Sequence, residues 1–327
     1  MPKVYGVAMR KGGQGKSTTV STAGRLCALY GARTLIIDLA QPGTTSASLR
    51  DIWPATPHGE LSAALLALHE TPAGVMPEAA QAEAALADSS LPVRLLSQPS
   101  WSGGELWVLP WDDLLGEAAA FLQSERVLSG LIESLAPDID LVLIDFPSEG
   151  GPLMTTALAA TDSVIMPMAP EAPALEGAAA TLRLLARVRE SGRPIELGGL
   201  LITRVEPRTN YKRLVEVVQA LKQAGTIEGE TLERKLLPFA IRSHEYFEQA
   251  FRYGVPVWER TDNMRDWAGY VMLAEWLLRD AGLGHLARNR RGPALLAPET
   301  RIIDTTAVML NEVEVMLRDF EQAHPAN

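Results

Sequence analysis

The sequence has few of the features that mark secreted, membrane-spanning or metal-cluster proteins. Cysteine occurs once, at Cys27, which excludes an intrachain disulfide framework and a site built from several cysteines. No run of about eighteen apolar residues occurs, so we expect no transmembrane helix. A strand-like segment at residues 3–9 leads directly into a glycine-rich loop, so we also expect no signal peptide. These absences favour a reduced, cytosolic protein.

Positive charge is also scarce. The 327 residues include 30 Lys and Arg against 40 Asp and Glu, a formal net charge of −10. A surface with this balance does not attract nucleic acid as a whole, although a local basic patch stays possible. Hydrophobic residues make up 47% and charged residues 21%, which is the composition of a folded globular chain and excludes global disorder.

Seven short apolar runs alternate with helical stretches along the chain. We expect strands at residues 4–9, 34–38, 106–109, 141–145, 163–167, 199–203 and 235–238. Continuous apolar runs of this length are typical of strands buried on both faces of a parallel sheet. The expected helices cover residues 16–31, 117–135, 173–190, 209–224 and 262–280. This alternation predicts an α/β fold, with a doubly wound, mostly parallel sheet and helices on both of its faces.

Two stretches fall outside this alternation. Residues 73–104 are rich in Ala, Pro and Ser, and we interpret them as a partly helical insertion. Residues 283–301 contain several Gly and Pro, and we interpret them as a linker. The expected organisation is therefore one large α/β domain at 1–282, the linker, and a helical extension at 302–327. The last helix either packs on its own domain or contacts another subunit.

The most specific signal is the segment RKGGQGKST, which runs from Arg10 to Thr18. It follows an expected strand and opens an expected helix, which is the context that a phosphate-binding loop requires. Glycines let backbone N–H groups approach phosphates, and the helix N-terminus adds a partial positive charge. The alternative, a glycine-rich turn with an incidental lysine, fits this context poorly. The expected nucleotide-binding residues here are Gly12, Gly13, Gln14, Gly15, Lys16, Ser17 and Thr18, with Lys16 on the β- and γ-phosphates and the Ser17 hydroxyl on Mg²⁺.

The loop departs from the strict pattern G-x-x-x-x-G-K-[ST], because position 10 is arginine. It matches K-G-G-x-G-K-[ST] instead, with an additional lysine at Lys11. In this it resembles the deviant Walker A motif of the ParA/MinD family of P-loop ATPases. The resemblance implies ATP and Mg²⁺ as ligands and an ATP-sandwich homodimer, in which Lys11 reaches the phosphates bound to the other subunit. A cation supplied in this way neutralises phosphate charge only when two protomers meet.

Later segments extend the resemblance. Asp38 matches the first aspartate of the family's second-strand motif, and Asp145 follows an apolar run like the Walker B aspartate that holds Mg²⁺. An aspartate at the end of a strand can also simply cap the next turn, but the two motifs upstream favour a metal role for Asp145. The resemblance implies metal binding by Ser17, Asp38 and Asp145, and nucleotide contacts near Thr203, Pro238 and Phe239.

Position 40 departs from the family pattern, in which an aspartate helps to position or activate the attacking water. This chain has Ala40 there. Because phosphoryl transfer depends mostly on positioning and electrostatics, we expect slow hydrolysis with ATP binding intact. The sequence leaves open whether the alanine is natural or engineered, and whether Gln41 or Glu149 positions the water instead. The catalytic set implied by the resemblance is Lys11, Lys16, Asp38 and the position of Ala40.

The resemblance also implies partners. ParA-like ATP dimers bind DNA nonspecifically through phosphate contacts, and a ParB-like or adaptor protein stimulates their hydrolysis. The matching basic residues here are Arg208, Lys212, Arg213 and Arg242, for which a solvated helix start is the alternative reading. A MinD-like membrane contact is disfavoured because the expected last helix is acidic.

The overall expectation is a ParA-like ATPase, cytoplasmic and nucleoid-associated, that partitions plasmid or chromosomal DNA or positions a cargo. The alternatives are a hydrolysis-deficient scaffold or filament protein, and a MinD-like positioning ATPase.

Overall fold

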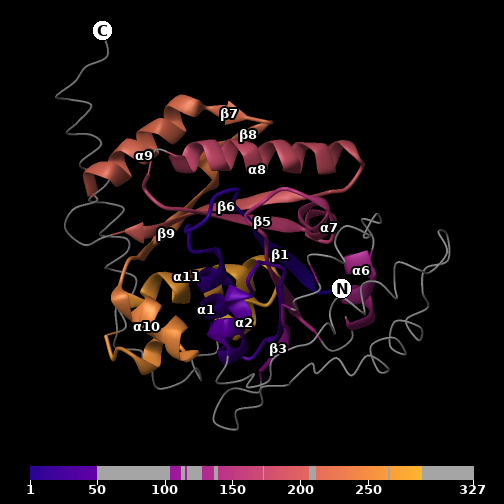
Figure 1. Cartoon of the computed structure of the whole chain (residues 1–327), viewed down its shortest axis with the longest axis vertical. Helices are drawn as coiled ribbons and strands as arrows, with labels where there is room; N and C mark the ends of the chain where they lie inside the picture. The colour runs from indigo at the N-terminus through magenta and orange to yellow at the C-terminus, as the bar shows by residue number, and fades with distance from the viewer. Residues whose placement is uncertain are drawn as a thin grey trace.

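A seven-stranded sheet forms the centre of the molecule (Figure 1). The computed structural model describes residues 1–49, 104–111, 115, 127–135, 139–171, 173–205, 211–263 and 266–288. The strand order is β3-β2-β4-β1-β5-β6-β9, and every neighbouring pair is parallel. The strands are β1 (Lys3–Val7), β2 (Arg33–Asp38), β3 (Glu105–Leu109), β4 (Leu141–Asp145), β5 (Ser163–Met168), β6 (Glu196–Val205) and β9 (Leu236–Arg242).

Side chains alternate between the two faces of the sheet, and both faces are covered. In β4, Leu141 and Leu143 pack into one hydrophobic cluster, while Val142 and Ile144 pack into the other. Successive residues of a strand point to opposite faces, so a strand buried on both sides is apolar throughout. This is why the strands appear in the sequence as continuous apolar runs.

Helices form a layer on each face (Figure 1). One layer contains α1 (Lys16–Leu29), α2 (Thr44–Ser48), α10 (Glu245–Tyr253), η3 (Val257–Glu259), α11 (Ala268–Asp280) and α12 (Gly284–Arg288). The other contains α6 (Val127–Leu135), α7 (Pro152–Ala159), α8 (Pro173–Glu190) and α9 (Tyr211–Ala224). A short hairpin of β7 (Thr226–Ile227) and β8 (Glu230–Thr231), followed by η2 (Leu232–Lys235), leads into β9. The expected α/β fold with a doubly wound parallel sheet is confirmed.

The backbone of α11 packs directly against the backbone of β9. A Cβ atom at Gly269 would overlap the carbonyl oxygen of Ala240, so only glycine lets the helix backbone reach the strand at this point. The next residue, Tyr270, is buried. This contact sets the position of α11 relative to the carboxyl end of β9.

All seven expected strands are present, and the expected helices at 16–31, 173–190 and 209–224 correspond to α1, α8 and α9. Helices α7 and α10 are additional to those expected. The insertion at 73–104 lies outside the described residues except for Gly104, and the extension at 302–327 lies wholly outside them. Within the proposed linker, residues 284–288 form α12, which packs on α11. Among the described helices, none is long and apolar enough to cross a membrane.

Candidate functional site

A cavity of about 500 Å³ opens at the carboxyl ends of the parallel strands. Its walls come from residues 13–18 after β1, from Ala40 and Gln41 after β2, and from residues 241–244 at the end of β9. Further lining residues are Thr44, Ser148, Thr203, Arg204, Phe247, Glu248 and Tyr270. In open α/β sheets this edge is where ligands bind, because the strand-to-helix loops converge there.

The loop between β1 and α1 has the backbone conformation that its glycines permit. Gly13 and Gly15 have φ values of 73° and 83°, in the left-handed region that is favourable for glycine. Gly15 immediately precedes α1, and no side chain caps the first N–H groups of that helix. These N–H groups and the helix dipole therefore form an anion-binding end at the cavity wall.

Lys16 places its ammonium group inside the site. Only 6% of the residue is exposed, and its Nζ atom donates hydrogen bonds to Ser148 Oγ at 2.6 Å and to the carbonyl oxygen of Lys11 at 3.4 Å. Burial lowers the pKa of Lys16, and the nearby Asp145 acts in the opposite direction. The cation is thus held by the β4–α7 loop, where it can meet the charge of a phosphate.

Two carboxylates lie side by side at the ends of β2 and β4. Asp38 and Asp145 are register partners, and both are fully buried. The N–H and hydroxyl groups of Ser46 donate to Asp38 Oδ2 at 2.7 and 2.6 Å, and the N–H of Ala40 donates to Oδ1 at 3.1 Å. The Thr45 hydroxyl donates to Asp145 Oδ2 at 2.7 Å.

The negative charge of this carboxylate pair is not fully compensated by the surrounding groups. Burial raises the pKa of both groups, and the charge of Asp145 raises the pKa of Asp38 further. Hydrogen bonds from Ser17 and Thr45 only partly offset the effect at Asp145. The Oδ1 atom of Asp145 is buried without a hydrogen-bond partner. Two buried like charges with a free oxygen beside a serine hydroxyl fit a hard divalent cation such as Mg²⁺, which binds through one or two carboxylates, waters and phosphate oxygens.

The wall opposite the loop contributes hydrogen bonds to the loop backbone. Thr203 Oγ1 donates to the carbonyl oxygen of Gln14 at 3.0 Å, and Arg204 Nη1 donates to the carbonyl oxygen of Gly13 at 3.0 Å. The Gln14 side chain accepts a hydrogen bond from the N–H of Ala169, at 2.8 Å. The loop is therefore tied to the ends of both β5 and β6.

The family profile of the CobQ/CobB/MinD/ParA nucleotide binding domain (CbiA) matches residues 5–257. The chain belongs to this family. The chromosome partitioning protein ParA of Caulobacter vibrioides is 28% identical over 262 residues, which cover 78% of this chain and 86% of ParA.

Two solved structures share the fold. McdA from Cyanothece, in an aspartate-to-alanine variant bound to ATP, superposes with a TM-score of 0.64 at 20% identity, over 85% of this chain and 96% of that one. Cobyrinic acid a,c-diamide synthase from Mycobacterium smegmatis, with a bound ATP analogue and magnesium, has a TM-score of 0.57 at 26% identity, over 90% and 99%.

In this CobQ/CobB/MinD/ParA domain, the fold brings together most of the site residues that the sequence predicts. Ser17, Asp38 and Asp145 meet at one point, and Lys16, Ala40 and Thr203 border the cavity. Ser148 and Arg204 also belong to the site and are not among the expected residues. Their only sequence signals are that Ser148 follows the Asp145 strand closely and that Arg204 adjoins Thr203.

Other expected residues lie elsewhere. Pro238 is exposed and Phe239 is packed in the core, so neither borders the cavity, which is lined instead by residues 241–244. Pro238 and Phe239 miss the cavity because β9 is longer than expected. The strand continues to Arg242, and only its end reaches the cavity. Arg242, expected on a DNA-binding surface, borders this cavity.

Three further expectations concern residues outside the cavity or outside the described part of the chain. Gly12 is exposed and does not line the cavity. Lys11, expected to reach the phosphates of another subunit, also lies outside the cavity and pairs with Glu171. Arg208 lies outside the described residues, and Lys212 and Arg213 belong to α9, where their side chains are not described.

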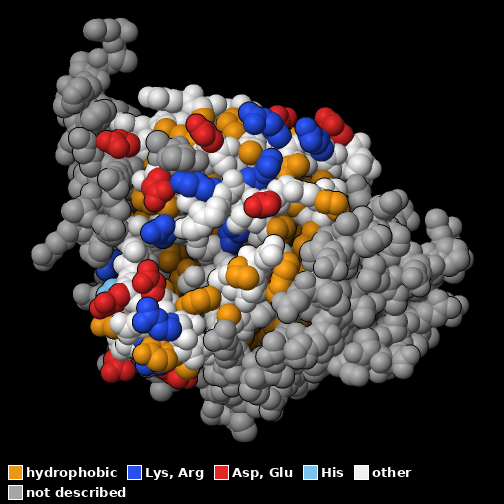
Figure 2. Space-filling view, in the orientation of Figure 1, with side chains coloured by type: hydrophobic (Ala, Val, Ile, Leu, Met, Phe, Trp, Pro, Cys, Tyr) orange, Lys and Arg blue, Asp and Glu red, His pale blue; other side chains and the backbone are white. Residues whose placement is uncertain are grey.

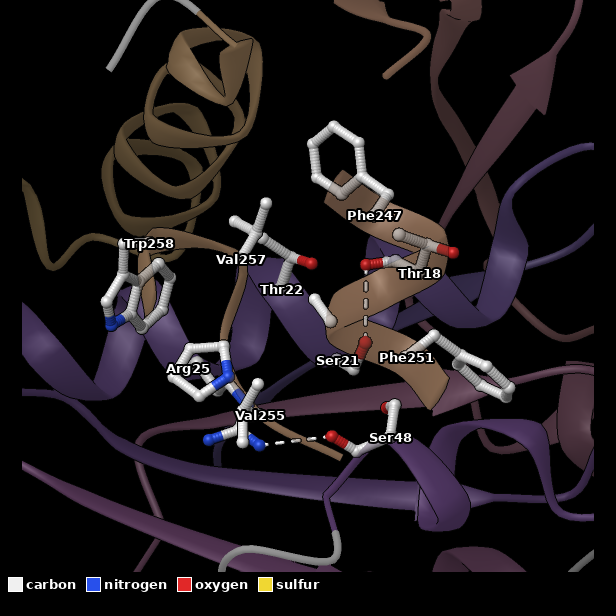
Figure 3. Close-up of a pocket in the computed structure, with 12 residues that line it drawn as sticks. Thr18, Ser21, Thr22, Arg25, Ser48, Phe247, Phe251, Val255, Val257 and Trp258 are labelled. Carbon is white, nitrogen blue, oxygen red and sulfur yellow. Dashed lines mark hydrogen bonds between the residues drawn. The ribbon is translucent and has the colours of Figure 1, made fainter. Parts of the chain in front are cut away.

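A second, much smaller pocket lies between α1 and the α10–η3 segment (Figure 3). Its accessible volume of about 20 Å³ is room for about one water molecule. Arg25 of α1 donates a hydrogen bond from Nη2 to the carbonyl oxygen of Ser48 at 3.1 Å, which ties α1 to the end of α2. Phe247 borders both this pocket and the larger cavity. The small pocket is a packing gap between these elements.

Proposed function

We propose that this protein is an ATP-dependent dimerisation switch that acts on DNA. In this proposal ATP and Mg²⁺ bind in the cavity, two copies join across their phosphate-binding loops, and the dimer binds DNA nonspecifically. Slow hydrolysis, stimulated by a ParB-like or adaptor protein, then releases it. The process served is partition of plasmid or chromosomal DNA, or positioning of a cargo on the nucleoid, in the cytoplasm.

The observation that carries the proposal is the divergent placement of the two loop lysines. Lys16 is directed into its own site, 2.6 Å from Ser148. Lys11 lies outside the cavity, where its Nζ is 3.0 Å from Glu171 Oε2. This divergence supports a role for Lys16 at the nucleotide of its own subunit and a role for Lys11 at the phosphates of a second copy.

The ion pair of Lys11 is weak enough to be exchanged. The two side chains are 26% and 42% exposed. Exposed ion pairs contribute only about 0–1 kcal/mol, because water screens them and ordering two long side chains costs entropy. Lys11 can therefore leave Glu171 for a triphosphate at low cost, which supports a dimer formed only when nucleotide is present.

Each binding group of the cavity has a defined role in holding ATP–Mg²⁺. Lys16 and the N-terminus of α1 would neutralise phosphate charge, while Ser17, Asp38 and Asp145 would hold Mg²⁺, which would supply further charge stabilisation to the phosphates. Ala40 borders the same cavity and has no group that can orient a water molecule. The site is therefore proposed to bind ATP well and to hydrolyse it slowly.

The alanine at position 40 also favours a second candidate function. A domain that binds ATP without turnover would act as a lasting dimer, and hence as a scaffold or filament subunit rather than a cycling switch. Turnover in the presence and absence of a stimulating partner separates the two.

The proposed DNA contact rests on the segment around α9. Figure 2 shows acidic and basic side chains interspersed on the face that it displays, without a wide basic area among the described residues. Arg242 belongs to the cavity wall. We assign the DNA contact to Arg208, Lys212 and Arg213 because they match the family's basic positions in sequence, and we keep Arg242 as a nucleotide-side residue.

The proposal is tested by measuring molar mass and DNA binding of the purified protein with and without ATP–Mg²⁺. We expect a monomer without nucleotide, a dimer with ATP, and DNA binding only by the dimer. The logarithm of the affinity should fall linearly with the logarithm of salt concentration, as counterion release requires. Arg208→Ala with Lys212→Ala should weaken DNA binding without changing the dimer.

The matched control for these variants is Arg187→Ala, which removes an exposed arginine from α8. It should leave DNA binding unchanged. A protein that stays monomeric with ATP–Mg²⁺ would refute the switch, and a dimer that ignores DNA at low salt would refute only the DNA part.

A further inference from the structure

Two consecutive residues at the end of β6 hold two consecutive peptide groups of the phosphate-binding loop. Thr203 Oγ1 binds the carbonyl oxygen of Gln14, and Arg204 Nη1 binds that of Gly13, each at 3.0 Å. The residues lie about 190 positions apart in the chain, and β5 separates β6 from the strand that carries the loop. The contacts are therefore a product of the tertiary fold.

Fixing a carbonyl oxygen also fixes an N–H group. In a planar trans peptide the C=O and N–H bonds point in opposite directions. Holding the oxygens of Gly13 and Gln14 toward β6 directs the N–H groups of Gln14 and Gly15 away from β6. Successive N–H groups in a loop with left-handed residues form a concave anion-binding surface, and Gly13 and Gly15 are left-handed here.

The backbone of Arg204 is itself strained. Its φ is 57°, a left-handed value that costs a residue with a side chain about 1–2 kcal/mol. The register between β6 and β9 shifts between Ile202 and Val205, so the irregularity brackets this residue. Such irregularities commonly re-aim a side chain near a functional site. Here the irregularity carries the guanidinium group to Gly13.

One other described residue that is not glycine has a positive φ, and its setting is different. Glu228 has φ 49° and lies with Gly229 in the two-residue turn of the β7–β8 hairpin. Two-residue turns of this kind require positive φ at their central residues, so the turn itself explains Glu228. No turn explains Arg204, which lies within a strand and contacts the loop.

We propose that Arg204 and Thr203 are positioning residues that hold the phosphate-binding loop with its N–H groups turned toward the phosphates. The inference rests on the proposed function, in that the cavity is taken to bind ATP. Because the two residues act on the loop backbone, they raise the affinity for ATP and ADP alike. They have no direct role in choosing the base.

The test compares stability and nucleotide affinity in the full-length protein. Arg204→Gly removes both the backbone strain and the guanidinium group. We expect its thermal midpoint to equal or exceed that of the wild type, while its affinities for ATP–Mg²⁺ and ADP–Mg²⁺ both fall about tenfold, the effect of losing a hydrogen bond from a charged donor. Arg204→Lys, which keeps charge and strain, should recover part of that loss. Thr203→Val should also lower the affinity for both nucleotides.

The matched control is Glu228→Gly, which relieves the same kind of strain far from the cavity. It should raise the midpoint and leave both affinities unchanged. If Arg204→Gly and Thr203→Val bind nucleotide as tightly as the wild type, the positioning role is wrong. If the affinity for ATP falls and the affinity for ADP does not, the two residues contact the γ-phosphate instead of positioning the loop. A wild-type protein that binds no ATP overturns the proposed function itself, which keeps the two failures distinct.

Discussion

Lys11 and Glu171 are 160 residues apart in the chain and form an ion pair of 3.0 Å beside the loop that joins β1 to α1. Glu171 lies just after β5, in the segment that leads to α8. Lys16, which belongs to the same loop, faces inward instead and binds Ser148. The two lysines of this short motif therefore lie in different places. Lys16 is buried at the cavity, and Lys11 lies outside it.

Replacing the two lysines by alanine should have separable effects. Lys16→Ala removes the buried cation and should abolish ATP binding. Lys11→Ala breaks only a half-buried pair at the surface, so it should cost about 1 kcal/mol of stability or less, keep ATP affinity within a few fold, and prevent the ATP-dependent dimer. Calorimetry and light scattering measure these effects. Equal loss of ATP affinity in both variants would rule out the assignment of Lys11 to a second subunit.

Restoring a carboxylate at position 40 should restore turnover. Ala40→Asp places an acceptor at the cavity wall, and we expect phosphate release to rise on the order of a hundredfold, because a positioned group of this kind acts on the barrier. ATP affinity should change little. Ala40→Asn is the control that adds similar bulk without charge. Unchanged phosphate release in Ala40→Asp would show that another group, such as Gln41, positions the water.

The buried carboxylate pair should make stability depend on pH. The pKa of Asp38 is raised to about 7, from an unfolded value of about 4, so the folded state binds protons more tightly than the unfolded state in this range. The stabilisation is present below about pH 4 and is lost as pH rises toward about 7. Asp38→Asn should therefore flatten the decline in thermal midpoint between pH 5 and pH 7.5.

Magnesium should reverse this trend, because it binds the charged carboxylates. We expect ATP–Mg²⁺ to raise the midpoint of the wild type more at pH 7.5 than at pH 5.5, and Asp38→Asn to lose most of that gain. The comparison of wild type with variant cancels the titration of other groups. Parallel pH curves for the two proteins would count against the coupled pair.

The close approach of α11 to β9 should make Gly269 sensitive to a single methyl group. Gly269→Ala forces a Cβ against the carbonyl oxygen of Ala240, and we expect a loss of about 1–3 kcal/mol with weaker nucleotide binding, since Tyr270 borders the cavity. Gly130→Ala in α6 meets nothing within 4 Å and should instead gain about 0.5–1 kcal/mol from helix propensity. Chemical denaturation measures both. A neutral Gly269→Ala would mean that α11 can shift freely.

The sequence by itself determined the strands and the phosphate-binding loop, because both are local. A strand buried on two faces must be apolar throughout, and the loop is a contiguous segment whose glycines and lysines act where they stand. Helices α7 and α10 were not predicted from the sequence, because each is too short to give a clear periodic pattern. Their termini are marked only by Pro152 at the start of α7 and by His244 and Gly254 around α10.

Only the tertiary structure decided which distant groups meet. Asp38 and Asp145 form a pair because β2 and β4 are neighbours in one register, and Lys11 faces Glu171 because β5 ends beside the loop. The cavity is bordered by residues 241–244 rather than by Pro238 and Phe239 because β9 extends that far. Strand order, register and strand length depend on packing over the whole sheet, and so does the reach of Arg204 to Gly13. No local pattern of residues specifies them.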